Sequence, residues 1–359
     1  MNVAFLTRYA GHGASSRVRA MQYRPALAAL GIDATPMPLL SDDYLAALYA
    51  GRHARAETAR CYVRRLADMP QARRHDLLWI EKELLPFVPA WLEARLLRGK
   101  PYVLDLDDAI FHNYDRSGSA MVRRLLGRKI DRLMAGARLV TVGNSYLQAR
   151  ALDAGAAWVE ILPSVIDLDR YPAPLWPASH ALPQTARQVL RVVWIGSPAT
   201  VQYLERLREP LQAAARQLPL ELRVIGAPAP AWPGVQTRTV AWSVATESAE
   251  VRACDIGVMP LDDSPWEQGK CSFKLVQYMA CGLPVIASPV GMNVDVVAPG
   301  VDGLLARSTE EWQAALQQLA ADPAQRQAMG QQGRQKVEQR YCLQVTGPQL
   351  ARLLHRAAA

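Results

Sequence analysis

The chain has 359 residues, of which half are apolar and 21% are charged. This composition is typical of globular proteins, argues against a disordered chain, and at this length predicts about two domains. No run of 18 apolar residues is present, and the apolar start Met1–Leu6 is too short for a signal peptide. The five cysteines are scattered without a Cys-x-x-Cys pair, which argues against disulfides or a zinc site. We therefore expect a cytoplasmic protein.

The formal charge of +8 is unevenly distributed. Residues 1–180 carry 24 Lys/Arg and 18 Asp/Glu, a net charge of +6, whereas residues 181–359 carry only +2. A basic half suggests an anionic partner, and charge alone does not choose between a membrane surface, a phosphorylated substrate and nucleic acid.

The first half alternates strand-like and helix-like segments. The expected strands are Asn2–Leu6, Ile32–Leu39, Asp76–Ile80, Pro101–Leu106, Arg138–Val142 and Ala157–Leu162. Helices are expected after the Gly-containing loop Thr7–Ser15, over Tyr44–Asp68, and around Trp91–Leu97. We assign residues 1–172 to an N-terminal lobe.

Residues 173–188 are rich in proline, which predicts a linker, and the alternation restarts after them. The expected strands there are Val192–Ile195, Leu222–Ile225, Thr237–Val240, Asp255–Met259, Pro284–Ala287 and Gly303–Ala306. Helices are expected over Val201–Gln217 and at about 272–281, 309–320, 323–340 and 343–357. We assign 189–342 to a C-terminal lobe and 343–359 to a helix that packs back on the first lobe.

This alternation predicts an α/β protein of two Rossmann-like lobes, each a doubly wound parallel sheet. In open α/β sheets ligands bind at the carboxyl ends of the strands. The residues that follow each strand are therefore the candidates for function.

The segment Gly269–Pro284 is the first candidate. With a helix over about 272–281, Lys270, Lys274 and Gln277 fall on one helical face. Lysines normally favour the other end of a helix, so two of them at its N-terminus favour a phosphate site over a solvated face.

Two turns after strands are further candidates for contact with phosphate. Gly291, within Val290–Asp295, allows close approach of the backbone to a ligand. Gly196–Thr200 joins the first strand of the second lobe to its first helix, where nucleotide phosphates often bind. This turn is neither G-x-G-x-x-G nor a P-loop, which argues against a dinucleotide dehydrogenase and a P-loop nucleotidase.

Carboxylates cluster after the fourth strand, at Asp105, Asp107 and Asp108. A bound metal, a general base, or ion pairs with Arg17 and Arg19 would each offset their mutual repulsion. We assign a catalytic role to Asp107 and Asp108, against the alternative of a helix cap with salt bridges.

Three basic or titratable side chains of the first lobe are further candidates for contact with a ligand. Arg17 and Arg19 lie at a helix start, where an anion or a pairing acid would stabilise them. His112 follows the carboxylates. Structural roles are the alternative for all three.

The segment Met121–Met134 alternates apolar residues at helical spacing with basic ones. An amphipathic basic helix can lie on an anionic membrane, and an ordinary surface helix with its apolar stripe in the core gives the same pattern.

Together these segments resemble the family 4 glycosyltransferases of the GT-B fold, which include many bacterial enzymes of surface-polysaccharide and lipopolysaccharide assembly. The stretch Asp255–Gly291 resembles the family most, with D-I-G-V-M-P-L followed by W-E-Q-G-K-C-S-F-K-L-V-Q-Y-M-A-C-G-L-P-V-I-A-S-P-V-G. Val301–Leu305 and Ile161–Tyr171 resemble two further family segments.

The resemblance implies transfer of a sugar, with retention at the anomeric carbon, from a nucleoside-diphosphate sugar to a glycan or lipid-linked acceptor. It implies two lobes that face one another across a cleft, transfer in that cleft with the acceptor on the first lobe, and no metal or other cofactor. The candidates on that lobe for contact with the acceptor are Arg17, Arg19 and His112. Lys270 and Lys274 complete the expected catalytic set. The positions that would contact the donor are Gly196, Ser197, Trp242, Lys270, Lys274, Gln277, Gly291, Met292 and Asn293.

The chain departs from the family in its acidic residues. The family's pair of glutamates maps to Gly269 and Gln277, with Glu267 two positions early, and its frequent His-Asp becomes Asp107-Asp108. A sugar-nucleotide epimerase or a phosphorylase of the same fold, and a non-catalytic protein of the membrane surface, remain alternatives. Nucleic acid is not an expected partner because no recognised binding motif is present.

Overall fold

The computed structural model describes residues 1–11, 13–49, 51–52, 55–174 and 189–359. These residues form two compact units. Unit 1 comprises Met1–Ser164, Gln268–Cys271 and Leu343–Ala359, and unit 2 comprises Val165–Glu267 and Ser272–Cys342. The first unit thus ends at Ser164, before the predicted boundary at 172. The predicted linker 173–188 lies outside the described residues except for its first two positions.

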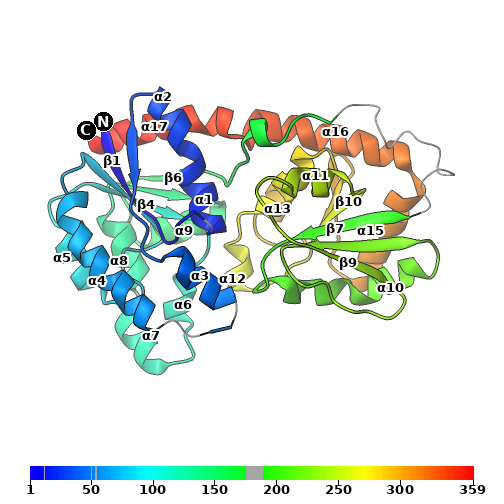
Figure 1. Ribbon diagram of the computed structural model, residues 1–359, viewed down its shortest axis with the longest axis horizontal. Helices are drawn as coiled ribbons and strands as arrows, with labels where there is room; N and C mark the ends of the chain where they lie inside the picture. The colour runs from blue at the N-terminus through cyan, green and yellow to red at the C-terminus, as the bar shows by residue number, and fades with distance from the viewer. Residues whose placement is uncertain (12, 50, 53–54, 175–188) are drawn as a thin grey trace. The chain divides into compact units, whose positions relative to one another are not determined.

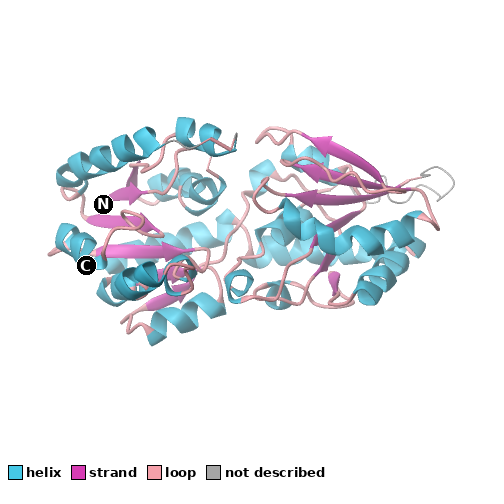
Figure 2. Cartoon of the chain, turned by 90° about the horizontal axis from the view of Figure 1, so that it is seen from below, coloured by secondary structure: helices cyan, strands magenta, loops and turns pink. Residues whose placement is uncertain are grey.

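Unit 1 is built on a six-stranded parallel sheet in the order β2-β1-β3-β4-β5-β6 (Figure 1). Its strands are β1 (Asn2–Leu6), β2 (Asp33–Pro36), β3 (Leu77–Glu81), β4 (Tyr102–Leu106), β5 (Leu139–Val142) and β6 (Val159–Ile161). The central strands β3, β4 and β5 are buried along their whole length, because helices cover both faces of the sheet (Figure 2).

The helices of unit 1 follow the strands in turn. They are α1 (Ala14–Arg19), α2 (Arg24–Ala29), α3 (Asp42–Tyr49), α4 (Arg55–Ala72), α5 (Ala90–Leu97), α6 (His112–Asp115), α7 (Ala120–Leu126), α8 (Lys129–Gly136) and α9 (Ser145–Asp153). The chain ends in α17 (Leu343–Ala358), which packs against α2 and β4 of the same unit.

Unit 2 repeats the design with the strand order β12-β11-β10-β7-β8-β9, also all parallel. Its strands are β7 (Leu190–Ile195), β8 (Leu220–Ile225), β9 (Gln236–Val240), β10 (Ile256–Met259), β11 (Val285–Ala287) and β12 (Gly303–Leu305). Its helices are α10 (Arg208–Ala215), α11 (Glu247–Arg252), α12 (Pro265–Gln268), α13 (Phe273–Ala280), α14 (Asn293–Val296), α15 (Thr309–Ala321) and α16 (Pro323–Arg340). Trp194, Leu207 and Trp312 belong to a core that joins β7, the segment before α10, and α15.

The prediction of two parallel α/β lobes is confirmed, and all the expected strands are present. Three helix predictions are wrong in detail. Val201–Gln217 begins as a 3₁₀ helix over Val201–Leu207 before α10, and Met121–Met134 breaks at Gly127 into α7 and α8. The expected helix Tyr44–Asp68 is two helices, α3 and α4. In the described ranges, no helix is long and apolar enough to cross a membrane.

Candidate functional site

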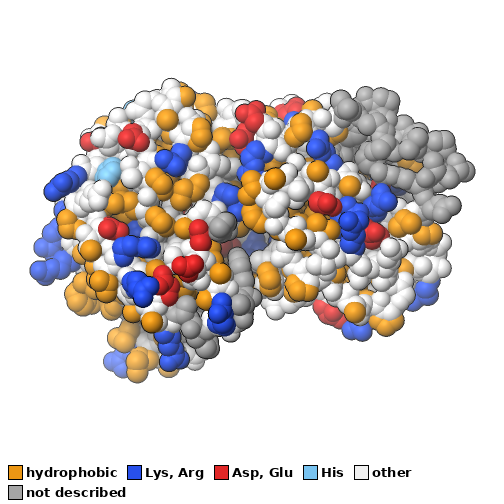
Figure 3. All heavy atoms as spheres, in the orientation of Figure 1, with side chains coloured by type: hydrophobic (Ala, Val, Ile, Leu, Met, Phe, Trp, Pro, Cys, Tyr) orange, Lys and Arg blue, Asp and Glu red, His pale blue; other side chains and the backbone are white. Residues whose placement is uncertain are grey.

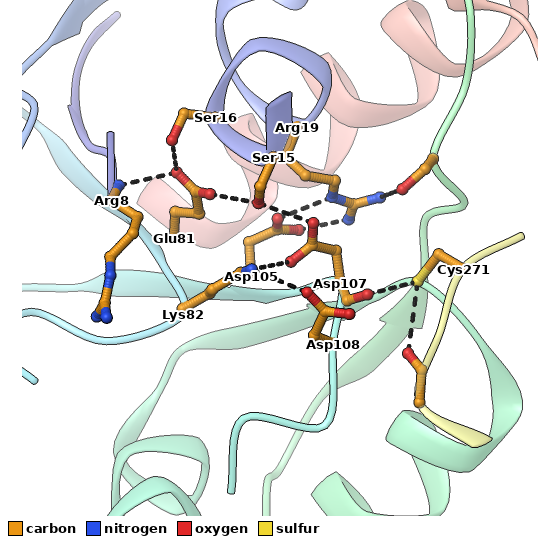
Figure 4. Close-up of polar contacts among 12 residues, drawn as sticks. Arg8, Ser15, Ser16, Arg19, Glu81, Lys82, Asp105, Asp107, Asp108 and Cys271 are labelled. Carbon is orange, nitrogen blue, oxygen red and sulfur yellow. Dashed lines mark hydrogen bonds and ion pairs between the residues drawn. The ribbon is translucent and has the colours of Figure 1, made fainter. Parts of the chain in front are cut away.

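The start of α1, the end of β3 and the loops after β3 and β4 bring a cluster of polar side chains together in unit 1 (Figure 4). The strands β1, β3 and β4 are parallel neighbours, so their carboxyl ends meet at one edge of the sheet. We call Ser15, Glu81, Lys82, Asp107 and Asp108 the carboxylate cluster. The cluster contains three acids and one lysine, and a second lysine, Lys270, lies next to it.

Glu81 is the last residue of β3 and is buried at the base of the cluster. Its carboxylate accepts hydrogen bonds from the Ser15 and Ser16 hydroxyls at 2.6 and 2.5 Å, and from the Arg8 backbone N–H at 2.8 Å. Burial raises the pKa of Glu81, while the charge of Lys82 opposes this rise. Glu81 therefore fixes the loop after β1 against the end of β3.

Lys82 lies between two carboxylates. Its Nζ is 3.1 Å from Asp107 Oδ1 and 3.1 Å from Asp108 Oδ2. Burial lowers the pKa of Lys82, but Asp107 and Asp108 outweigh it and raise this pKa well above its ordinary value. Its backbone is left-handed, with φ 67°, a conformation that is costly for a residue with a side chain. The cluster thus holds a strained residue, and such strain is concentrated at functional sites.

Asp107 and Asp108 differ in exposure. The Asp107 side chain is 12% exposed and lies 2.8 Å from Ser15 Oγ, whereas that of Asp108 is 28% exposed. Burial raises the pKa of Asp107, but the charges of Lys82 and Arg19 outweigh this and hold it below its ordinary value. Asp107 is therefore ionised at neutral pH, and Asp108 is the carboxylate of this pair that is more open to a ligand.

Asp105 takes no part in the exposed cluster. Arg19 binds it through two hydrogen bonds of 2.9 and 2.6 Å, and Thr141 donates a third. Arg19 also donates to the Leu162 carbonyl at 2.7 Å and is only 2% exposed. Arg19 was expected either to contact an acceptor or to form a structural ion pair, and the structure shows the ion pair. Contact between Arg19 and an acceptor would require this buried pair to open.

The other two residues predicted to bind an acceptor lie near the same edge. Arg17 is half-buried on α1. His112 is buried, with Nδ1 2.8 Å from Asp115 and Nε2 2.8 Å from the Tyr146 hydroxyl. Both ring nitrogens of His112 are therefore already hydrogen-bonded to protein groups.

Lys270 belongs to unit 1, not to the helix that carries Lys274. Residues 268–271 are held there by Asn144, whose Nδ2 donates to the carbonyls of Gln268 and Lys270, and by Cys271, whose thiol donates to the Asp107 carbonyl at 3.0 Å. Lys270 Nζ lies 3.7 Å from Asp108 Oδ1. The prediction that Lys270 and Lys274 share a helical face is wrong because α13 begins only at Phe273, after the left-handed Ser272.

Lys274 lies at the carboxyl edge of the sheet in unit 2. Its Nζ is 5.3 Å from the centre of the Trp194 ring, next to the end of β7. Gly196 follows β7, and a Cβ there would lie 2.4 Å from the Trp194 ring. The turn Gly196–Ser197 therefore requires glycine and passes beside Lys274.

The N-terminus of α13 favours an anion. Its first turn holds Lys274 and no acidic residue, and Ser272 provides no side-chain cap. The Ser272 hydroxyl instead donates to Asn293 at 2.7 Å, and Asn293 donates to the Ser288 carbonyl at 2.9 Å. Asn293 is buried, as is Met292, so at this turn only backbone groups, beginning at the left-handed Gly291, are suited to contact a ligand.

Gln277 and Trp242 are both connected by hydrogen bonds to the buried carboxylate of Glu247, Gln277 through the Tyr171 hydroxyl and Trp242 directly. Gln277 donates to the Tyr171 hydroxyl at 2.9 Å, and that hydroxyl donates to Glu247 at 2.8 Å. Trp242 donates to Glu247 at 2.6 Å, and Arg170 at 3.0 Å. Gln277 is buried, so the expected contact with a donor hydroxyl competes with its bond to Tyr171.

Sequence reasoning missed several of these residues. Glu81 and Lys82 follow an expected strand directly, so the rule applied to the other strands was sufficient to find them. No local sequence pattern indicated a role for Glu247. Glu267, buried and hydrogen-bonded to Tyr203 and Ser264, was noted only for its distance from the family's glutamate.

The comparisons with known proteins agree with this architecture. Residues 178–322 match the family model described as "Glycosyl transferases group 1". No curated protein sequence matches the chain. The fold and the family resemblance expected from the sequence are therefore confirmed by the family model together with the structures below.

Three solved structures share the fold over 99% of this chain. Sucrose-phosphate synthase from Thermosynechococcus elongatus has a TM-score of 0.72 at 18% identity, with 98% of its own chain covered. Alr3699/HepE of Anabaena, in complex with UDP and glucose, has a TM-score of 0.69 at 17% identity, with 100% of its own chain covered. The E. coli structure titled "Trehalose-6-phosphate" and bound with UDP-2-fluoro glucose has a TM-score of 0.65 at 14% identity, with 98% of its own chain covered. These are GT-B proteins, so this chain has the GT-B fold.

Proposed function

We propose that the protein is a retaining glycosyltransferase, which moves a sugar from a nucleoside-diphosphate sugar to a hydroxyl of a glycan or lipid-linked acceptor. The observation that carries the proposal is that Lys274, the glycine turn at Gly196 and the start of α13, which has no side-chain cap, lie at one edge of unit 2 and are suited to bind an anion. The family model over 178–322 supports it, as do the similar structures of HepE with UDP and glucose and of the E. coli protein with UDP-2-fluoro glucose.

In this proposal unit 2 stabilises the leaving group. Cleavage of the bond between sugar and diphosphate leaves negative charge on the phosphate. The Lys274 ammonium and the positive end of the helix dipole at the start of α13 provide positive charge at fixed positions. The Gly196–Ser197 and Gly291–Met292 backbones approach the phosphate or the sugar. Protein groups thus supply the charge stabilisation, and the mechanism we propose uses no metal.

The carboxylate cluster of unit 1 serves the acceptor. Asp108, the more exposed carboxylate, accepts a hydrogen bond from an acceptor hydroxyl, and Lys82 and Lys270 fix its position. Asp107 keeps Lys82 charged and in place. In retaining transfer the leaving phosphate oxygen takes the acceptor proton, so neither aspartate has to act as a strong base.

The test is a transfer assay on the full chain. Purified protein is incubated with nucleotide sugars, with and without a glycan or lipid-linked acceptor fraction, and the nucleoside diphosphate and the new glycoside are quantified. The proposal expects diphosphate release that depends on acceptor, with the anomeric configuration of the donor retained. Interconversion of the sugar nucleotide without acceptor would instead show an epimerase, and turnover that requires only inorganic phosphate would show a phosphorylase.

The substitution Asp108→Asn distinguishes the acceptor role of unit 1 from nucleotide binding by unit 2 in the same assay. We expect the substitution to lower the transfer rate at least about tenfold, the lower end of the loss when a positioning contact is removed, while nucleotide affinity stays unchanged. Asp33→Asn, at an exposed carboxylate of the same unit, is the control. Full activity of Asp108→Asn would assign Asp108 to structure alone.

A further inference from the structure

The loop after β3, residues 82–89, holds an exposed aromatic side chain on a strained backbone. Phe87 is left-handed, with φ 56°, and its side chain is 61% exposed. Hydrophobic side chains are exposed elsewhere on unit 1 as well (Figure 3), so exposure alone does not distinguish Phe87. Its backbone does, because among the residues that the structure describes only three besides glycines have a positive φ, and Lys82 and Phe87 are two of them. Such strain persists where the surrounding structure imposes it and is concentrated at functional sites.

Buried charged groups fix the first part of this loop. Glu93 on α5 accepts hydrogen bonds from the Leu84 and Leu85 N–H groups at 3.1 and 3.2 Å. Lys129 on α8 donates to the Leu85 carbonyl at 2.6 Å and lies 2.8 Å from Glu93. Both charged side chains are fully buried, so displacement of the loop would take hydrogen bonds away from buried charges, which is costly. The backbone is thus held in place up to Leu85.

Two tyrosines fix the second part of the loop. Tyr62 on α4 donates to the Pro86 carbonyl at 2.8 Å. The Tyr114 hydroxyl on α6 accepts a hydrogen bond from the Phe87 N–H at 3.1 Å and donates one to Glu83 at 2.6 Å. The Tyr114 ring also packs edge-on against Phe87, with ring centres 5.3 Å apart. The phenyl ring is therefore fixed in position while most of its surface stays exposed.

The exposed ring lies at the same edge of the sheet as the carboxylate cluster. Lys82, which contacts Asp108, begins the loop that leads to Phe87. The Cα atoms of Lys82 and Phe87 are at most about 18 Å apart, because the extended chain between them spans no more than this. Glu83 also accepts a hydrogen bond from Arg8 Nη1 at 3.2 Å, which joins the loop after β1 to the same network. A short oligosaccharide therefore has the length to extend from Asp108 to Phe87.

A sugar ring is the ligand that this surface fits. The face of an aromatic ring carries partial negative charge and attracts the C–H groups that line one face of a pyranose ring. Lys82 is the only cation of residues 82–89, and it is already paired with two carboxylates. The loop therefore favours an uncharged sugar over an anionic ligand.

We propose that Phe87 is an acceptor subsite, on which one sugar ring of the acceptor stacks while a hydroxyl of another sugar lies at Asp108. The acceptor is therefore an oligosaccharide, free or attached to a lipid, which the protein recognises by its sugar rings. This inference rests on the proposed function and makes its acceptor more specific.

Transfer kinetics with the full chain test this subsite. The acceptor is the oligosaccharide that mild acid releases from the acceptor fraction of the transfer assay, so no lipid is present. Phe87→Leu keeps an apolar side chain without the aromatic face, Phe87→Tyr keeps that face, and Leu152→Ala removes an exposed apolar side chain of α9 as the control. We expect the KM for the acceptor to rise about three- to tenfold in Phe87→Leu alone, the range of one aromatic contact. The kcat at saturating acceptor and the KM for the nucleotide sugar should stay unchanged.

A second pair of variants separates binding from stability. A positive φ favours glycine, so Phe87→Gly should unfold at a higher temperature than Phe87→Ala, while both raise the acceptor KM by the same factor. An acceptor KM that instead follows the unfolding temperature would assign Phe87 to structure alone and overturn the proposal.

Two further results would overturn it. An unchanged acceptor KM in Phe87→Leu would show that the ring does not touch the acceptor. A rise with the lipid-linked acceptor but not with the released oligosaccharide would assign the ring to the lipid. In both cases wild type still transfers sugar, whereas no transfer by wild type to any acceptor would overturn the proposed function and this inference with it.

Discussion

Single side chains determine the electrostatics of both candidate sites. Lys82 forms ion pairs with both Asp107 and Asp108 in unit 1, and the first turn of α13 in unit 2 places Lys274 at the helix end that normally favours an anion. The two lysines therefore have different tasks. Lys82 compensates charge within the protein, whereas Lys274 is placed to compensate charge on a ligand.

Replacement of Lys274 tests the ligand role directly. Lys274→Met keeps an unbranched apolar side chain beside Trp194 and removes the charge, so we expect nucleoside-diphosphate affinity to fall by about 1–3 kcal/mol, the scale of a charge-assisted hydrogen bond. Titration calorimetry measures this change. Arg216→Ala, which removes a charge from an exposed position of the same unit, should leave the affinity unaltered. An unchanged affinity in Lys274→Met would remove Lys274 from the donor site.

The lowered pKa of Asp107 predicts how the stability of the protein depends on pH. Its pKa in the folded protein is lowered, so its contribution to stability is present above the unfolded pKa of about 3.9 and is lost as the pH falls toward the folded value. We expect wild type to unfold at a higher temperature than Asp107→Asn at pH 7, and this difference to shrink below about pH 4.

The thermal unfolding midpoint of both proteins between pH 7 and pH 3 checks this dependence. Asp33→Asn, at an exposed carboxylate, provides the baseline. A difference between wild type and Asp107→Asn that stays constant over the whole range would show that the ion pairs of Asp107 contribute nothing to stability.

At the scale of elements, a short segment from the second half of the chain completes unit 1. Residues 268–271 lie against the loop after β5, where the Cys271 thiol packs beside Gly143. A Cβ at Gly143 would be 1.9 Å from Cys271 Sγ, so there is no room for a side chain. The packing of the Cys271 side chain on Gly143 holds this segment where Lys270 lies beside Asp108.

Gly143→Ala should therefore displace this segment. We expect a loss of about 1–3 kcal/mol in stability from overpacking, and a fall in transfer rate because Lys270 moves away from Asp108. Gly143→Ala/Cys271→Gly removes the clashing thiol and should recover most of the thermal unfolding midpoint. Gly118→Ala, with no atom within 4 Å of the added Cβ, is the control. A Gly143→Ala protein as stable and active as wild type would show that the segment is not held there.

The same elements show what the sequence pattern could and could not predict. Strands such as β4 and β10 were predictable because both faces of a parallel strand are buried, which leaves a continuous apolar run. Asp107 and Asp108 were found because they follow such a run. The position of Lys270 was not, because helical spacing was extended through Ser272, whose left-handed backbone separates Lys270 from α13.

Long-range pairings were outside the reach of local patterns. Arg19 and Asp105 are 86 residues apart, and Gln277 and Tyr171 are 106 apart. Both pairs depend on the packing of elements that are distant in the chain. Arg19 and His112 were assigned to a ligand, although the fold gives their side chains protein partners.

At the scale of the whole molecule, the two units divide the proposed reaction. Unit 2 carries the edge that we propose binds the donor phosphate and matches the glycosyl transferases group 1 model over most of its length, while unit 1 carries the carboxylate cluster. The donor is thus the part of the reaction that the structure and the comparisons support most directly, and the acceptor is left to the transfer assay.

The measurement that tests the central claim most directly is a thermal-shift screen of the full chain against UDP, GDP, ADP, CMP and dTDP, with and without Mg²⁺. A nucleotide at about 100 times its dissociation constant should stabilise the protein by about 2.7 kcal/mol. We predict a clear rise of the unfolding midpoint with one diphosphate, independent of Mg²⁺ and smaller in Lys274→Met. No response to any of these nucleotides, or an equal response in Lys274→Met, would contradict a donor site at this edge of unit 2.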